Sequence, residues 1–175
     1  NKIFNTPNVI IAGGVGSFEP RKFPLKDCEK YENKSIFYAI KDKKIFEGKT
    51  LTIFGGGDSA LDWAVELSKN SKINLVHRRD DFRAAQATVN QVKEMSKSGK
   101  INLFTKYQIN SIRGKNKLEG IEIKHDDGNV KDLNTDFVLG FFGLIMQLGP
   151  IADWGLNLDK KTISVDTEKF ETNQK

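Results

Sequence analysis

The sequence is poor in cysteine, with Cys28 as the single one among 175 residues. One cysteine excludes an intramolecular disulfide, a paired-thiol redox centre and a metal site built from cysteines. Apolar runs are short as well, since none approaches the roughly 20 residues that a membrane-spanning helix needs. The first residues lack the basic and then apolar pattern of a secretion signal. We therefore expect a cytoplasmic protein with no membrane association.

Charge shows only a small excess of one sign, a formal +5 from 28 basic and 23 acidic residues. The lysines are spread over the whole chain, without a basic helix, a zinc-ligand spacing or an aromatic-basic RNA motif. No nucleic-acid partner is expected, and a basic nucleic-acid-binding domain remains only as an alternative. Hydrophobic residues make up 38%, which is typical of a globular chain with its own core.

A glycine turn is the most informative motif. It lies between an apolar run at 50–54, which predicts a strand, and a helical pattern at about 59–69. Such a turn lets the backbone approach a pyrophosphate, and the first amides of the helix point at the anion. We predict a dinucleotide site at this turn, with Asp58 or Ser59 as the helix N-cap; the alternative is an ordinary strand-to-helix turn. The predicted site residues here are Gly55, Gly56, Gly57, Asp58, Ser59 and Ala60.

Basic residues follow the next predicted strand, 72–77. In a mononucleotide-binding unit this strand end faces the adenine ribose, where an acid would bind the 2′-hydroxyl and an arginine a 2′-phosphate. Here the strand ends in His77, Arg78 and Arg79, and Arg83 follows about one helical turn later. These four residues predict NADP rather than NAD. The alternative is a solvated loop whose arginines pair with the two aspartates after Arg79.

The order of elements predicts an α/β fold. A second helix is expected over about 84–97, ended by Gly99. Short alternating runs from 101 to 123, with a turn signal at 126–129, predict an antiparallel meander. The apolar run 136–143 predicts a buried strand that returns to the parallel sheet. The expected architecture is a Rossmann-like parallel sheet with helices and an antiparallel β-meander, in three β/β/α layers.

The two ends of the chain lack the regular alternation of strands and helices that the middle of the chain shows. A short strand is expected at 8–12, running into the turn Gly13-Gly14-Val15-Gly16, which two following prolines disqualify as a phosphate cradle. A short helix at 149–155 and a strand at 162–165 are followed by polar residues, and no element is closed. We expect a segment of a larger protein. His125, beside the 126–129 turn, is expected to be an exposed strand-end residue rather than a ligand.

The chain resembles the NADPH domain of the thioredoxin-reductase-like flavoproteins, within the FAD-dependent pyridine nucleotide-disulfide oxidoreductase superfamily, over nearly its whole length. The glycine turn and the run 77–84 carry this resemblance. Thioredoxin reductases have Cys-x-x-Cys upstream of the turn, whereas this chain has Tyr38-Ala39-Ile40-Lys41, similar to the Tyr-Ala-Val-Lys run of the ferredoxin–NADP reductase branch. Residues 61–64 and 148–156 also resemble that branch.

The resemblance implies a division into residues 1–35 as an FAD-domain flank and linker, 36–145 as the NADP(H)-binding domain, and 146–175 as a second flank. It implies hydride transfer from NADPH to FAD and then electron transfer to ferredoxin or a similar iron–sulfur carrier, in a homodimer when full length. It adds Gly143 to the cofactor-binding residues, although 142–147 is more apolar than the family's usual run. No catalytic residue and no metal ligand are expected here, because the protein's part is to place the nicotinamide against the flavin.

Two FAD-binding motifs of the family, the first glycine fingerprint and a Gly-Asp near the C-terminus, are missing from this sequence. The chain should therefore bind NADP(H) but neither hold FAD tightly nor turn over by itself. Two alternatives remain open. One is a noncatalytic dinucleotide-binding module, and the other is a thioredoxin reductase-like enzyme that lacks Cys-x-x-Cys and takes its thiols from another chain.

Overall fold

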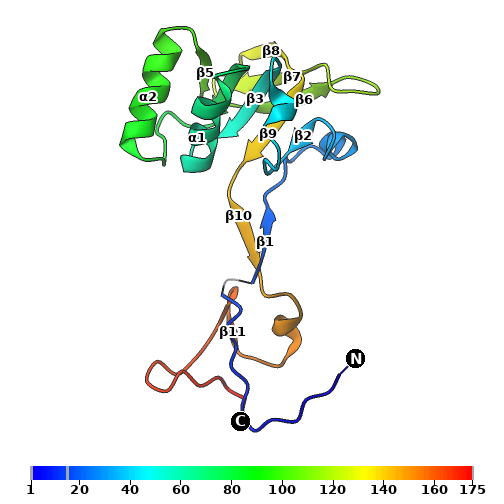
Figure 1. The fold of residues 1–175 in the computed structure, drawn as a ribbon, viewed down its shortest axis with the longest axis vertical. Coiled ribbons are helices and arrows are strands. Elements are labelled where there is room, and N and C mark those ends of the chain that lie inside the picture. Colours follow the sequence, from blue (N-terminus) through cyan, green and yellow to red (C-terminus); the bar gives the residue numbers. More distant parts are fainter. Residues whose placement is uncertain (1, 15, 175) are drawn as a thin grey trace. The chain divides into compact units, whose positions relative to one another are not determined.

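A computed structural model describes residues 2–14 and 16–174 (Figure 1). The chain divides into two compact units, a larger one over Pro20–Gly143 and a smaller one that combines Asn1–Glu19 with Leu144–Lys175. Every residue predicted as part of a binding site lies in the larger unit. None of the helices described meets the length and hydropathy of a membrane span.

A five-stranded parallel sheet forms the centre of the larger unit, in the order β2-β9-β3-β4-β5. Its strands are β2 (Ile36–Phe37), β3 (Thr50–Gly55), β4 (Lys72–His77), β5 (Ile101–Thr105) and β9 (Phe137–Phe141). The predicted strands at 50–54, 72–77 and 136–143 are confirmed within one or two residues. Because all five strands run the same way, their carboxyl ends meet at one edge of the sheet, where ligands bind in open α/β sheets.

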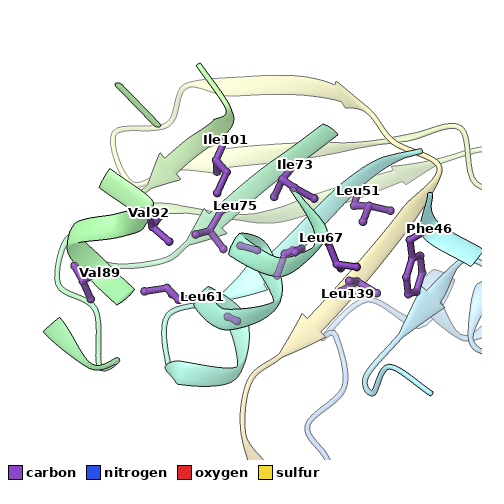
Figure 2. Packing of buried hydrophobic residues seen from close by; sticks show 13 residues of the cluster. Phe46, Leu51, Leu61, Leu67, Ile73, Leu75, Val89, Val92, Ile101 and Leu139 are labelled. Carbon is purple, nitrogen blue, oxygen red and sulfur yellow. The ribbon is translucent and has the colours of Figure 1, made fainter. Parts of the chain in front are cut away.

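Two helices cover one face of this sheet, α1 (Asp58–Leu67) and α2 (Gln86–Lys97), and they lie side by side in Figure 1. Alternate strand residues such as Leu51 and Leu75 point to this face and form one buried cluster with Leu61 of α1 and Val92 of α2 (Figure 2). All four are at most 1% exposed. Gly99, with φ at +74°, follows the end of α2 as predicted.

A three-stranded antiparallel meander covers the other face, with β6 (Tyr107–Arg113), β7 (Gly120–His125) and β8 (Val130–Asn134). Ile121 and Ile123 of β7 pack in a second core with the strand residues Phe54 and Val76. The β/β/α layering is therefore confirmed. The meander is shorter than predicted, because 101–105 pairs in parallel with β4 as the edge of the main sheet.

Three polar side chains form a ladder on the meander face of the sheet. Asn74 donates to Thr52 Oγ1 at 3.3 Å, and Asn102 donates to Asn74 Oδ1 at 3.0 Å. The three residues occupy equivalent positions in β3, β4 and β5. Thr52 and Asn74 are buried, so these bonds remove the cost of leaving buried polar groups without partners.

Short elements complete the larger unit before β3. They are the 3₁₀ helices η1 (Lys26–Tyr31) and η2 (Lys44–Phe46), which contribute Cys28, Tyr31 and Phe46 to the two cores.

The smaller unit contains all but the last residue of β1 (Ser17–Pro20), which pairs with β10 (Leu144–Gln147), and the antiparallel pair β11 (Leu158–Asp159) and β12 (Thr162–Ile163). The predicted helix at 149–155 is the 3₁₀ helix η3 (Gly149–Asp153), and the strand predicted at 162–165 is limited to β12. The strand predicted at 8–12 is wrong. No described residue pairs with this segment, and a strand without a neighbour leaves its backbone groups to water.

The glycine-rich turn after that segment is described only in part, because Val15 lies outside the described residues. Gly16 N–H donates to the carbonyl of Gly13 at 3.0 Å, which closes a turn as predicted. A Cβ on Gly16 would lie 1.9 Å from the carbonyl oxygen of Gln147, so a side chain is excluded there.

Candidate functional site

A cleft of about 480 Å³ opens at the carboxyl ends of β3, β4 and β9, entirely within the larger unit. It brings together all predicted site residues except Asp58, Ser59 and Ala60. Those that line it are Gly55, Gly56, Gly57, His77, Arg78, Arg79, Arg83 and Gly143. The strand ends therefore assemble residues that lie up to 88 positions apart in the sequence, from Gly55 to Gly143.

The glycine turn is closely packed at its beginning. A Cβ on Gly55, where φ is +152°, would lie 2.6 Å from the carbonyl oxygen of Phe141 and 2.7 Å from Cβ of Ala60. Glycine at 55 and a small residue at 60 thus allow β3, β9 and α1 to meet. Ala60 is completely buried, which makes it a packing residue of the turn rather than part of the cleft wall.

Gly57 differs, because no atom lies within 4 Å of the position that its Cβ would take. It is the N-cap residue of α1, and no side chain caps the helix. The prediction of Asp58 or Ser59 as the N-cap is therefore wrong. The open space beside Gly57 and the uncapped amides of α1 suit the close approach of an anionic group.

The loop after β4 carries three arginines, Arg78, Arg79 and Arg83, which all line the cleft. Asp80 pairs instead with Lys106 Nζ at 2.7 Å, an interaction that lowers the pKa of Asp80. Within the described part of the chain, no ion pair joins these three arginines to an acid. The loop is therefore not the internally neutralised one that formed the alternative prediction, and its positive charge faces the cleft.

The imidazole of His77 packs against the glycine turn at Gly56. A Cβ on Gly56 would lie 2.1 Å from His77 Cε1, and the imidazole stacks on Phe82 with ring centroids 5.0 Å apart. His77 Nε2 lies 3.0 Å from the carbonyl oxygen of Asp81 and must be its donor. Burial lowers the pKa of His77, the bond to Asp81 opposes this, and the three arginine charges lower it further. A neutral ring with its proton on Nε2 has no second proton to donate to an anion.

Other residues of the cleft lining were not selected by the sequence analysis. Tyr107 and Gln108, the first two residues of β6, are among them. Tyr107 is held by contacts with Phe104, at 5.8 Å between ring centroids, and with His125, at 4.7 Å. His125 is the last residue of β7, as predicted, but the expected exposure is wrong, since its side chain is only 24% exposed and pairs with Asp127.

A second basic pair, Arg21 and Lys22, also lines the cleft. The backbone N–H of Arg21 donates to the carbonyl of Gly143 at 3.1 Å, which fixes this segment beside the end of β9. Phe142, next to Gly143, packs edge-on against Phe23 at 4.8 Å. An Arg-Lys pair between two prolines was the available signal in the sequence, but nothing local indicates that it reaches this cleft.

Cys28 does not line the cleft and is only 1% exposed. Burial raises its pKa from the usual 9.0 to about 11, and the charges of Glu32 and Asp27 add to this. The thiolate is the reactive form of cysteine, so this thiol is poorly reactive. Across the described residues, no group of three or more His, Cys, Asp or Glu side chains is arranged to hold a metal ion.

This thiol yields a test. At pH 8 a thiol reagent should modify Cys28 slowly in the folded chain and at the rate of an ordinary thiol in denaturant, as followed by Ellman absorbance. Because folding raises the pKa, the neutral thiol favours the folded state fully below pH 9, and this contribution is lost as pH rises toward 11. Unfolding free energies measured over that range should fall more steeply for wild type than for Cys28→Ala. Equal labelling rates in the two states would contradict the burial of this thiol.

Comparison with known proteins gives a family match over the whole chain. The model of the pyridine nucleotide-disulphide oxidoreductase family matches residues 1–175. A ferredoxin–NADP reductase of Pelagibacter ubique is 68% identical over 172 residues, which cover 98% of this chain and 51% of the relative. A ferredoxin–NADP reductase of Beijerinckia indica is 49% identical over 98% of this chain and 50% of its own. The chain thus spans about half the length of the curated relatives that it matches.

Solved structures with a similar fold include thioredoxin reductases. That of Lactococcus lactis is 25% identical with a TM-score of 0.76, over 89% of this chain and 52% of its own. That of T. acidophilum is 26% identical with the same TM-score, over 89% of this chain and 51% of its own. The Rossmann-like α/β fold with its additional antiparallel strands is therefore shared with these proteins.

Proposed function

We propose that this chain, which belongs to the pyridine nucleotide-disulphide oxidoreductase family, is the NADP(H)-binding part of a flavoprotein reductase. The observation that carries the proposal is the cleft itself, which is lined both by a glycine turn at a helix N-terminus and by three arginines that pair with no acidic side chain among the described residues. NADPH has two anionic centres, a diphosphate and a 2′-phosphate, and the cleft offers a separate group of donors to each.

The diphosphate would lie against Gly55, Gly56 and Gly57, because the backbone is uncovered at Gly57 and the first amides of α1 have no side-chain cap. Asp58, Ser59 and Ala60 would support this turn from the helix. The 2′-phosphate would lie against Arg78, Arg79 and Arg83, whose planar groups suit a phosphate dianion. His77 would hold the turn in place, since its ring packs under Gly56 and its Nε2 proton is engaged by Asp81.

When bound, the nicotinamide supplies a hydride and the flavin of the complete protein accepts it. The residues of this chain then have to bind and orient the cofactor. Phe142 and Gly143, at the end of β9, line the same cleft as the turn and would form the wall nearest the nicotinamide. Since binding and placement are the protein's contribution, we assign no catalytic acid, base or metal ligand to this chain.

We further propose that 36–145 is the NADP(H)-binding domain and that the segments on either side of it, 1–35 with its linker and 146–175, are flanking pieces of the FAD domain of a longer protein. The smaller unit exposes large apolar side chains, with Ile3 at 91%, Phe4 at 82% and Ile10 at 91%. Apolar surface of this kind usually packs against another part of a protein. The complete protein would hold FAD and would be a cytoplasmic homodimer.

For the electron acceptor we propose ferredoxin or a similar iron–sulfur carrier. Disulfide reduction by dithiol exchange needs two neighbouring thiols, and this chain has one, which is buried. The relatives named ferredoxin–NADP reductase support this choice, while the similarity to thioredoxin reductases keeps a reductase with thiols from elsewhere as the second candidate.

Titration of the 175-residue chain with NADPH and with NADH tests the binding proposal. We expect NADPH to bind at least about tenfold more tightly, because the 2′-phosphate adds hydrogen bonds to charged groups. Equal affinities would contradict it. For the complete protein, NADPH-dependent reduction of ferredoxin but not of thioredoxin is expected. A complete gene without a flavin-binding half would instead indicate a noncatalytic module.

A further inference from the structure

The side chain of Asp58 faces a loop far away in the sequence. Asp58 Oδ1 accepts a hydrogen bond from the backbone N–H of Ala85 at 2.7 Å. Ala85 directly precedes α2 and ends the loop that carries Arg78, Arg79 and Arg83. The carboxylate is not used to cap its own helix, because Gly57 is the N-cap residue and no side-chain cap bond is present.

The same loop is also attached to the glycine turn at Arg83. The backbone N–H of Arg83 donates to the carbonyl of Gly56 at 2.7 Å, and Gly57 forms an isolated parallel bridge with Arg83. The loop is held at its beginning as well, because His77 Nε2 at the end of β4 donates to the carbonyl of Asp81 at 3.0 Å. The diphosphate turn and the arginine loop are therefore joined by hydrogen bonds, and Asp58 anchors the end of the loop next to α2.

We infer that Asp58 is a positioning residue that sets the selectivity of the cleft for a ligand with a 2′-phosphate. The inference rests on the proposed function. When Asp58 anchors the loop, the arginine side chains start from a backbone that is already ordered. Without this anchor the ligand has to order the loop, and the loss of conformational entropy weakens binding. The negative charge of Asp58 by itself repels an anionic ligand. Two interactions of the carboxylate offset this repulsion: the positive end of the dipole of α1 stabilises the charge, and the hydrogen bond from Ala85 holds the loop.

Three variants separate the hydrogen bond from the charge. Asp58→Ala removes both, and Asp58→Asn removes the charge but keeps an oxygen that accepts from Ala85. Ala85→Pro removes the donor and keeps the carboxylate at residue 58, whose side chain has to turn away because the ring Cδ replaces the N–H. Ala85 is exposed with φ at −53° and ψ at 133°, a conformation that proline adopts, so this variant requires no backbone change at that residue.

The measured quantity is the ratio of the dissociation constants for NADH and NADPH, obtained by titrating each variant of the 175-residue chain. The two ligands differ only in the 2′-phosphate, so changes that affect the turn or the helix equally for both cancel in the ratio. We expect Asp58→Ala and Ala85→Pro each to lower the ratio by about tenfold, the effect of one lost hydrogen bond to a charged group. Asp58→Asn should keep a ratio close to that of wild type.

Asp62→Ala is the matched control, because it removes an exposed aspartate from the same helix one turn later. It should leave the ratio unchanged, and thermal melts should show all variants folded at the temperature of titration. The inference is overturned if Asp58→Ala and Ala85→Pro keep the wild-type ratio. A wild-type chain that binds both nucleotides equally, or neither, contradicts the proposed function instead.

Discussion

Arg78→Ala should weaken NADPH binding by about 1.5–3 kcal/mol, or roughly 10- to 150-fold, and leave NADH binding nearly unchanged. Arg78 lines the cleft at the end of β4, and in the described chain no acidic side chain pairs with it. Its loss removes one of three guanidinium groups available to a phosphate dianion. Isothermal titration calorimetry or quenching of protein fluorescence by each nucleotide would measure both affinities.

Arg113→Ala provides the matched control for this change. Arg113 is an exposed arginine of the meander that pairs with Asp132 at 3.2 Å and does not line the cleft. The substitution removes the same charge from the chain, and we expect both nucleotide affinities to stay as in wild type. A uniform loss of affinity for NADPH and NADH in Arg78→Ala would place this arginine elsewhere on the ligand.

The ratio of the dissociation constants for NADH and NADPH should also fall at high salt, because salt screens the attraction between exposed arginines and the 2′-phosphate.

The second large effect concerns stability, and substitutions at two glycines of the same turn should lower it to very different extents. Gly55→Ala should lower the free energy of unfolding by about 2–5 kcal/mol, because its Cβ would lie 2.6 Å from the Phe141 carbonyl oxygen at φ of +152°. Gly57→Ala should cost about 1 kcal/mol or less, since its Cβ meets open space and only the N-cap preference changes.

Nucleotide binding should show the reverse order for the folded variants. A methyl group at residue 57 stands where we place the diphosphate, so Gly57→Ala should lose affinity for NADPH and NADH alike. Chemical denaturation monitored by circular dichroism measures the first property, and titration of each nucleotide measures the second. Similar stability of the two variants would show that the approach of β9 and α1 does not depend on glycine at 55. Undiminished binding by Gly57→Ala would move the diphosphate away from the turn.

Local sequence patterns predicted most of the sheet. The strands at 50–54 and 72–77 and both helices follow from apolar periodicity, because side-chain burial repeats with the geometry of each element. The same reasoning failed at 8–12, where an apolar run has no neighbouring strand among the described residues. It also placed 101–105 in the meander, since alternation in the sequence does not reveal whether a strand pairs in parallel.

The candidate site was predicted only in part. Gly55 to Gly57 and Arg78, Arg79 and Arg83 lie at the ends of strands or in the loops that directly follow them, so a short sequence window contains each group. Arg21 and Tyr107 come from segments that no local rule connects with this turn. Their arrival in the cleft depends on how the meander and the segment before η1 pack on the sheet, which long-range contacts decide.

The sequence by itself determined the alternation of strands and helices from β3 to α2, the glycine turn, the basic strand end and the lack of a second cysteine. These features depend on backbone conformations and residue types within a few positions, where φ/ψ preferences and periodicity act directly. Only the tertiary structure decided that Asp58 accepts a hydrogen bond from Ala85, that His77 packs against Gly56 and that Asp80 pairs with Lys106 instead of an arginine. A polar side chain takes its partner from whatever the packed elements bring within reach, and that choice is made across the fold rather than along the chain.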